Sequence, residues 1–199
     1  MKITTTENGG VEIDFEATTT RRCGDCSLCC KLLPNVALDK RAGTPCAHQR
    51  HGKGCTIYPK RPQECVHWSC RWLAGGEETA GMRRPDRSHY VIDALPDTIR
   101  FVHKETGEPH EFEAAQIWVD PAFPKTKDDP ELRAYMLKMA VEHAMPTLLR
   151  WSNRVATAVF PPPLSADGEW HETTTECNTG FGRYSQLPAE WRASLDKSA

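Results

Sequence analysis

Eight cysteines fall within 48 consecutive residues of this 199-residue chain. They are Cys23, Cys26, Cys29, Cys30, Cys46, Cys55, Cys65 and Cys70. Thiols at this density are either oxidised in pairs to disulfides or coordinated to metal ions as thiolates. The choice constrains the fold strongly, because the segment has few apolar residues and is not expected to fold on hydrophobic burial alone.

The start of the sequence bears on this choice. Residues 1–10 lack the apolar core of a secretory signal peptide. No apolar run in the chain reaches the roughly 20 residues that span a bilayer. We therefore expect a cytoplasmic protein without a membrane partner. Because thiols are kept reduced in the cytoplasm, metal ligation or redox chemistry is favoured over a disulfide framework.

The spacing of the first cysteines suits metal binding. Cys23, Cys26 and Cys29 are separated by two residues each, and a tight turn with this spacing brings two sulfurs within reach of one ion. The same spacing resembles the loop that holds an iron–sulfur cubane, although a ferredoxin places its fourth cysteine three residues further on. Here Cys30 follows at once. Zinc, iron and an iron–sulfur cluster therefore all remain candidate cofactors.

The adjacent pair Cys29-Cys30 suggests more than one metal site. In extended backbone, successive side chains point to opposite faces, so we expect the two thiols to serve different ions. Eight cysteines would fill two four-thiolate sites. One four-iron cluster plus one zinc ion, or one cluster with four spare thiols, are the alternatives. We expect Cys23, Cys26 and one member of the pair in one site, and the other member with some of the later cysteines in the second.

Histidines are the rival ligands within this segment. His48, His51 and His67 lie among the cysteines. With enough sulfurs for two closed sites, we expect these histidines to be solvated or to lie behind the ligands. His67 is the first substitute should one cysteine not bind. The ninth cysteine, Cys177, is expected to be free and without function.

Charge is concentrated in the same segment. Residues 21–71 contain ten basic and three acidic residues, a net charge of +7, whereas the whole chain carries −2. A basic segment is typical of nucleic-acid binding, but cations also stabilise thiolates around divalent ions. We favour charge compensation, because Trp68 and Trp72 are expected in a small core rather than on a stacking surface. Nucleic acid is therefore a weaker candidate partner than metal ions.

No other catalytic constellation is visible. The chain lacks a phosphate loop, a nucleophile elbow and an HExxH motif. Glu111, Glu113 and Asp120 are expected to face solvent. Whether the chain is an enzyme is left open, and an iron-dependent or iron–sulfur enzyme of unknown substrate is the alternative to a metal-binding protein.

The cysteine pattern also resembles a known family. The segments CGDCSLCC at residues 23–30 and CTIYPKRPQECVHWSC at residues 55–70 resemble the YkgJ-type CxxCxxCC family. The resemblance implies a zinc- or iron-chelating domain in which all eight cysteines are metal ligands. Val66 stands where that family has arginine, and Trp68 where phenylalanine is usual. A similar cluster occurs in flagellin lysine methylases, but this chain shows no glycine-rich loop for S-adenosylmethionine.

The sequence predicts an α+β fold in four parts. A hairpin in residues 1–20 is expected to turn at Asn8-Gly9-Gly10. A metal-stabilised cysteine-rich region follows in residues 21–75, with a loop or linker over 74–87. It is expected to pack on an α+β region in residues 88–164. The last part, residues 165–199, reads as a polar and loosely ordered tail that aromatic residues such as Trp170 would dock.

Periodicity and turn residues predict the elements of the α+β region. Strands are expected at about 88–94, 98–104 and 110–119. A helix is expected from about 129 to 144, because Pro130 suits its first turn and apolar residues recur at helical spacing. A second hairpin is expected over 147–152 and 154–160, with Pro161 to Pro163 ending its last strand.

Overall fold

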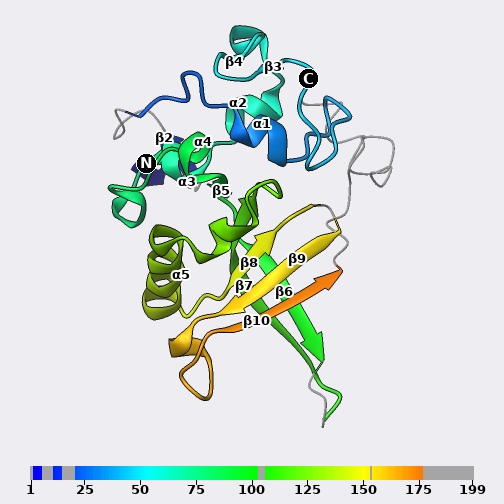
Figure 1. The fold of residues 1–199 in the computed structure, drawn as a ribbon. Coiled ribbons are helices and arrows are strands. Elements are labelled where there is room, and N and C mark those ends of the chain that lie inside the picture. Colours follow the sequence, from blue (N-terminus) through cyan, green and yellow to red (C-terminus); the bar gives the residue numbers. More distant parts are fainter. Residues whose placement is uncertain (1, 6–10, 15–20, 103–105, 153, 177–199) are drawn as a thin grey trace.

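A computed structural model describes residues 2–5, 11–14, 21–102, 106–152 and 154–176. These residues form the expected α+β structure around a six-stranded sheet (Figure 1). The sheet order is β10-β9-β8-β7-β5, and β6 also pairs with β7. Its strands are β5 (Tyr90–Ile92), β6 (Asp97–Val102), β7 (Pro109–Val119), β8 (Thr147–Arg150), β9 (Val155–Phe160) and β10 (His171–Glu176).

Strand β7 is the centre of this sheet. Its second half pairs antiparallel with β5, and its first half pairs antiparallel with β6. Strand β8 runs parallel to β7, with Ile117 opposite Leu149. A parallel neighbour needs a crossover, and helix α5 (Pro130–His143) provides it. The sheet therefore contains one β-α-β unit in an otherwise antiparallel arrangement.

Helix α5 confirms the sequence prediction closely. The Asp129 side chain caps it by accepting a hydrogen bond from the Glu131 backbone N–H at 3.0 Å, and Pro130 occupies the first turn. Leu132 and Met136 are fully buried on one face of the sheet. Burial of this apolar stripe holds the helix in place.

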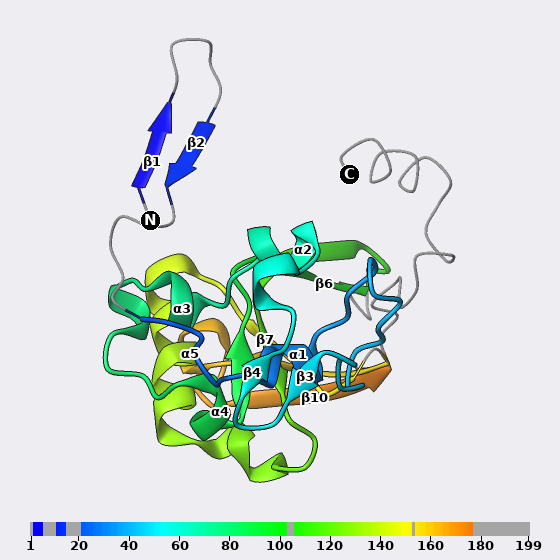
Figure 2. The ribbon, with the colours of Figure 1, turned by 90° about the horizontal axis from the view of Figure 1, so that it is seen from above.

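The cysteine-rich region covers the end of the opposite face (Figures 1 and 2). Val91 of β5 and Trp118 of β7 pack there against Leu28 and Leu32. The elements of this region are short. They are α1 (Leu28–Leu32), β3 (Gln49–Arg50), β4 (Gly54–Cys55), the 3-10 turn η1 (Tyr58–Lys60), α2 (Gln63–His67) and α3 (Arg71–Ala74). Trp68 and Trp72 pack against this small core, as predicted.

Two segments differ from the sequence prediction. The expected linker over 74–87 contains a 3-10 turn, η2 (Glu77–Thr79), and a short helix, α4 (Pro85–Ser88). The expected loose tail contains β10, which pairs along the whole of β9. Its threonines have high strand propensity, but an exposed edge strand lacks the apolar alternation that the prediction sought. Trp170 does pack against the core, as expected.

The N-terminal hairpin is also confirmed. Strands β1 (Lys2–Thr5) and β2 (Val11–Asp14) pair antiparallel, with Ile3 opposite Ile13. The predicted turn at Asn8 to Gly10 and the distal tail, including Cys177, lie outside the described residues.

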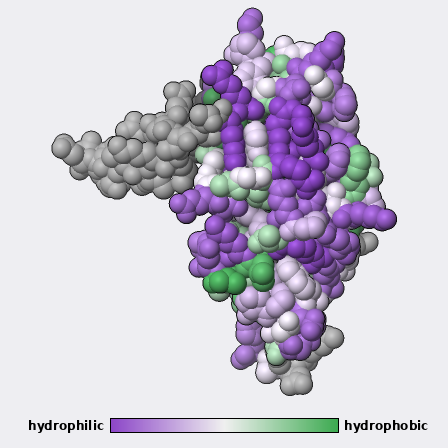
Figure 3. Space-filling model, turned by 60° about the vertical axis from the view of Figure 1, so that its left-hand side comes forward, coloured by the Kyte–Doolittle hydropathy of each residue, from purple (hydrophilic) through white to green (hydrophobic). Residues whose placement is uncertain are grey.

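The surface agrees with the polar composition of the chain. Figure 3 shows a face that is mainly hydrophilic, with hydrophobic side chains in small separate groups. In the part of the chain that the structure describes, no helix has the length and apolar character needed to cross a bilayer.

Candidate metal centre

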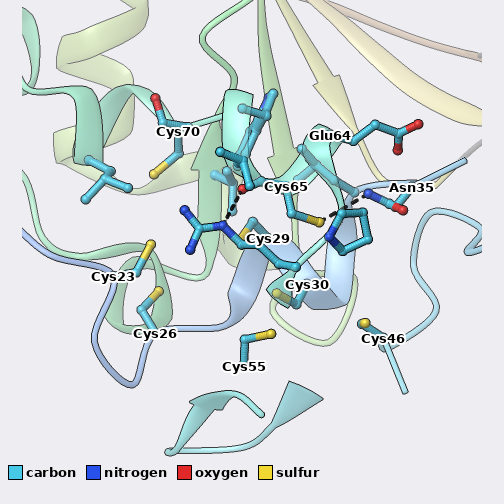
Figure 4. A pocket seen from close by; sticks show the side chains of 18 of the residues that line it. Cys23, Cys26, Cys29, Cys30, Asn35, Cys46, Cys55, Glu64, Cys65 and Cys70 are labelled. Carbon is cyan, nitrogen blue, oxygen red and sulfur yellow. Dashed lines mark hydrogen bonds between the residues drawn. The ribbon is translucent and has the colours of Figure 1, made fainter. Parts of the chain in front are cut away.

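All eight clustered cysteines line one cavity of about 590 Å³ (Figure 4). They come from a turn, two short helices, a strand and two connecting segments, yet their side chains surround the same space. Each of the eight is a free thiol rather than half of a disulfide. The structure therefore brings together every cysteine that the sequence singled out as a ligand.

A tight turn presents Cys23 and Cys26, as the spacing predicted. The Cys26 backbone N–H donates to the Cys23 carbonyl at 2.9 Å, and Gly24 adopts a positive φ of 54° within the turn. Gly54 lies against this turn, since a Cβ there would be 2.6 Å from the Gly24 carbonyl oxygen. Strand β4 can therefore bring Cys55 to the cavity only because residue 54 has no side chain.

The geometry expected for the adjacent pair is wrong. Cys29 and Cys30 lie in helix α1 rather than in extended backbone, so their side chains diverge by about 100° instead of 180°. The two thiols interact directly. The Cys29 thiol donates a hydrogen bond that lowers the pKa of Cys30 to about 7, and the same interaction, with burial, raises the pKa of Cys29. Adjacency therefore does not assign these sulfurs to opposite sides of the chain.

The later cysteines are held by backbone contacts to the earlier part. The Cys46 N–H donates to the Cys30 carbonyl at 2.9 Å. Cys65 lies in α2, and Arg61 caps this helix by donating from Nε to the Cys65 carbonyl at 2.9 Å. Cys70 immediately precedes α3. The loop from α1 back to α2 is thus fixed without disulfides.

The thiols form two electrostatic neighbourhoods that meet at Cys29 and Cys30, since Cys30 raises the pKa of Cys29 and adds to the effect of burial on the pKa of Cys23. Burial raises the pKa of Cys70 to about 12, and the thiols of Cys23 and Cys26 add to the effect. Burial also raises the pKa of Cys65 to about 11, with contributions from Cys30, Cys46 and Cys55. In Figure 4 the sulfurs of Cys70, Cys23 and Cys26 lie toward one side of the cavity. Those of Cys30, Cys46 and Cys65 lie toward the other side.

These shifts have one physical meaning. A buried thiolate is unfavourable, and several neighbouring thiolates repel one another. Burial raises the pKa of Cys23 and Cys26 as well. A positive charge in the cavity would reverse this penalty, because a metal ion deprotonates the thiols that coordinate it.

Lys40 supplies a positive charge at the cavity. The sequence alone did not single out this residue. Its side chain is buried and donates from Nζ to the Leu33 carbonyl and, at 3.3 Å, to the Arg41 carbonyl. Burial lowers the pKa of Lys40, and four nearby thiols, those of Cys46, Cys30, Cys29 and Cys65, oppose this. The arrangement is the one expected if basic residues compensate thiolate charge.

N–H groups of Asn35 and His48 donate directly to sulfur. Asn35 donates from Nδ2 to the Cys65 Sγ at 3.3 Å (Figure 4), and the His48 backbone N–H donates to the Cys46 Sγ at 3.4 Å. Hydrogen bonds to sulfur stabilise the thiolate over the thiol. No sequence pattern marked Asn35, because its role depends on the fold of the loop after α1.

Two carboxylates tie the cavity to the sheet. Asp93 accepts from the Trp68 Nε1 at 2.9 Å and from the Trp118 Nε1 at 3.2 Å. Asp120, expected to face solvent, is instead 2% exposed and pairs with Lys31 of α1 at 2.6 Å. The sequence did not predict either contact, because Asp93 and Trp68 are 25 residues apart and Asp120 and Lys31 are 89 residues apart.

The cavity provides metal-binding chemistry but no ready coordination shell. Within the described ranges, no group of three or more His, Cys, Asp or Glu side chains is arranged to hold a metal ion. The thiols surround a shared space rather than a common point. His48 and His67 also line the cavity, whereas His51 is exposed in the turn between β3 and β4. The donor set, eight thiols with neighbouring cations, fits zinc or iron.

Comparisons of the chain with protein-family models, with curated proteins and with solved structures found no match.

Proposed function

We propose that the chain is a metal-binding protein whose eight clustered thiolates hold one or two centres of zinc, iron or an iron–sulfur cluster. The observation that carries the proposal is the convergence of all eight free thiols on one cavity from elements spread over 48 residues. The resemblance to the CxxCxxCC family points to the same function. A metal there would hold together a region that has little hydrophobic core of its own.

The two electrostatic neighbourhoods suggest how the ligands would divide. Cys23, Cys26 and Cys70 would share one centre with Cys29, whose thiol is influenced most by Cys30 and then by Cys70 and Cys23. The second centre would draw on the remaining four, Cys30, Cys46, Cys55 and Cys65. Bound zinc would act as a structural cross-link, whereas iron or an iron–sulfur cluster would add redox chemistry.

Metal analysis of protein purified without oxygen tests the proposal. We expect one to two zinc centres per chain, or iron with or without acid-labile sulfide. Brown colour and broad visible absorption would identify an iron–sulfur cluster, and a colourless zinc protein would indicate closed thiolate sites. Protein that is folded and free of metal would refute the proposal.

An iron-dependent or iron–sulfur enzyme is the second candidate. It is favoured by the size of the cavity, because a closed structural site leaves no room beside the ion. If iron is present, an exchangeable ligand such as azide should change the visible spectrum. An unchanged spectrum would remove this candidate.

A nucleic-acid-binding zinc module is less well supported. Trp68 and Trp72 pack against the small core and donate their indole N–H groups to Asp93 and to the Met82 carbonyl. These rings therefore do not form a surface for stacking bases. Affinity for nucleic acid that falls steeply with salt would revive this alternative, and no binding at low salt would exclude it.

We propose the cytoplasm as the compartment. Eight free thiols that line one space would be oxidised readily in a secreted protein, whereas a reducing compartment preserves them.

A further inference from the structure

The cavity is larger than the proposed metal centres require. Its volume of about 590 Å³ falls in the range of small-molecule sites, roughly 300–1,000 Å³. A thiolate-bound zinc ion lies about 2.3 Å from its sulfurs, so it occupies space among its own ligands. Two such ions are small beside this cavity, which leaves room for another occupant.

The wall beyond the thiols has a large apolar part, in which the polar atoms of Trp68, Trp72 and Arg61 are already engaged. The indole N–H groups of Trp68 and Trp72 donate to partners in the protein. The Arg61 guanidinium donates to two backbone carbonyls and stacks over the Tyr58 ring, with 3.9 Å to the ring centroid. This part of the wall therefore offers hydrophobic contact rather than free hydrogen-bonding groups.

The opening of the cavity is apolar as well. Tyr58, Val66 and Leu95 line the cavity, and they are 45%, 45% and 65% exposed. Contiguous exposed apolar surface beside a concave space is typical of ligand-binding grooves.

We propose that the cavity binds a small organic molecule with an apolar body and one polar end. The body lies against Tyr58, Val66 and Leu95, which we call the apolar rim, and the polar end faces the thiols. The inference rests on the proposed function in one respect, namely that the polar end of the molecule meets a thiolate-held metal centre. A small molecule is favoured over a protein partner because the apolar surface continues from the rim into a concave space of ligand size.

The dye 8-anilinonaphthalene-1-sulfonate matches this description, since it has aromatic rings and one polar end. Fluorescence titration of the metal-loaded full-length protein would measure its affinity. The rim variant is Val66→Ser with Leu95→Ser. The matched control is Leu137→Ser with Val141→Ser on α5, where the two side chains are 39% and 66% exposed and do not line the cavity.

We expect one dye site in the wild-type protein, at least tenfold weaker binding in the rim variant, and less than a twofold change in the control. No binding by the metal-loaded protein, or equal binding by the rim variant, would overturn the inference. A wild-type dimer that the rim substitutions convert to a monomer would also overturn it in favour of a second copy of the chain. Measuring metal in every sample separates the two proposals, because rim-dependent binding by naturally metal-free protein would refute only the metal centre.

Discussion

The two halves of this molecule are stabilised in different ways. The sheet and α5 have long elements and a continuous core, with Met136, Ile117 and Leu149 at or near zero exposure. In the cysteine-rich region no helix exceeds five residues. Of the 21 buried hydrophobic residues in the described part of the chain, only Leu28, Leu32 and Cys70 belong to it. Hydrophobic burial can account for the first half but not for the second.

The junction between the halves is partly apolar and partly ionic. Leu28 and Leu32 pack on Val91 and Trp118, and the carboxylates of Asp93 and Asp120 accept hydrogen bonds from the cysteine-rich side. The sheet therefore acts as a platform for the cysteine-rich region, which the proposed metal would cross-link. This comparison predicts that each half responds to different perturbations.

Metal removal should give the largest effect. A structural thiolate–zinc site supplies about 10 kcal/mol or more of binding free energy in small domains, comparable with the whole stability of an ordinary domain. Chelation should therefore abolish amide-exchange protection across residues 23–70 while the core strands β7, β8 and β9 retain theirs. Hydrogen-exchange mass spectrometry checks this directly. Uniform loss of protection in both halves would contradict the comparison.

Cys26→Ser should lower both metal content and melting temperature, because it removes one proposed ligand from the Cys23 turn. Cys177→Ser is the matched control, since it removes a thiol that lies outside residues 23–70 in the sequence and should change neither quantity. Elemental analysis and thermal denaturation provide the measurements. Equal metal content in the two variants would count against the ligand assignment.

Met136→Ala should act on the other half. Deleting this fully buried side chain leaves a cavity between α5 and the sheet and should cost about 2–5 kcal/mol. Leu137→Ala, one residue away and partly exposed, should cost much less. Denaturant titration measures the loss, and metal content per folded chain should be unchanged. Selective loss of metal from Met136→Ala would show that the halves are not energetically distinct.

Asp93→Ala should weaken the junction. It leaves two partly buried indole N–H groups, those of Trp68 and Trp118, without their acceptor, at a cost of about 2 kcal/mol. Asp93→Asn keeps one oxygen acceptor and should lose about half as much. Stability of both variants can be followed by urea unfolding with tryptophan fluorescence. A larger loss of unfolding free energy in Asp93→Asn than in Asp93→Ala would exclude this role for the carboxylate.

The smallest effect concerns pH. A hydrogen bond from Arg84, which also pairs with Asp25 in the Cys23 turn, holds the pKa of Asp86 below its usual value. Asp86 therefore contributes stability above its unfolded pKa of about 3.9, and this is lost as pH falls through the lower folded value. The pair is partly exposed, so the contribution should stay below about 1 kcal/mol. Asp86→Asn should flatten the acid limb of the stability curve, and an unaltered limb would contradict the assignment.

The sequence predicted the parts of the molecule that depend on local signals. Helix α5 followed from Pro130 and apolar periodicity, and the Cys23–Cys26 turn followed from spacing. Helix α1 did not, because five residues are too few to show a helical period, and Cys29-Cys30 was therefore wrongly placed in extended backbone. The roles of Lys40, Asn35 and Asp93 depend on contacts across the fold, which no local pattern contains.

The central claim is that sulfur from this cavity is bound to metal. X-ray absorption at the zinc or iron edge, on full-length protein purified without oxygen, measures the ligands directly. The account predicts a first shell dominated by sulfur, at about 2.3 Å for zinc. A shell made only of nitrogen and oxygen, or a folded protein without metal, would contradict it.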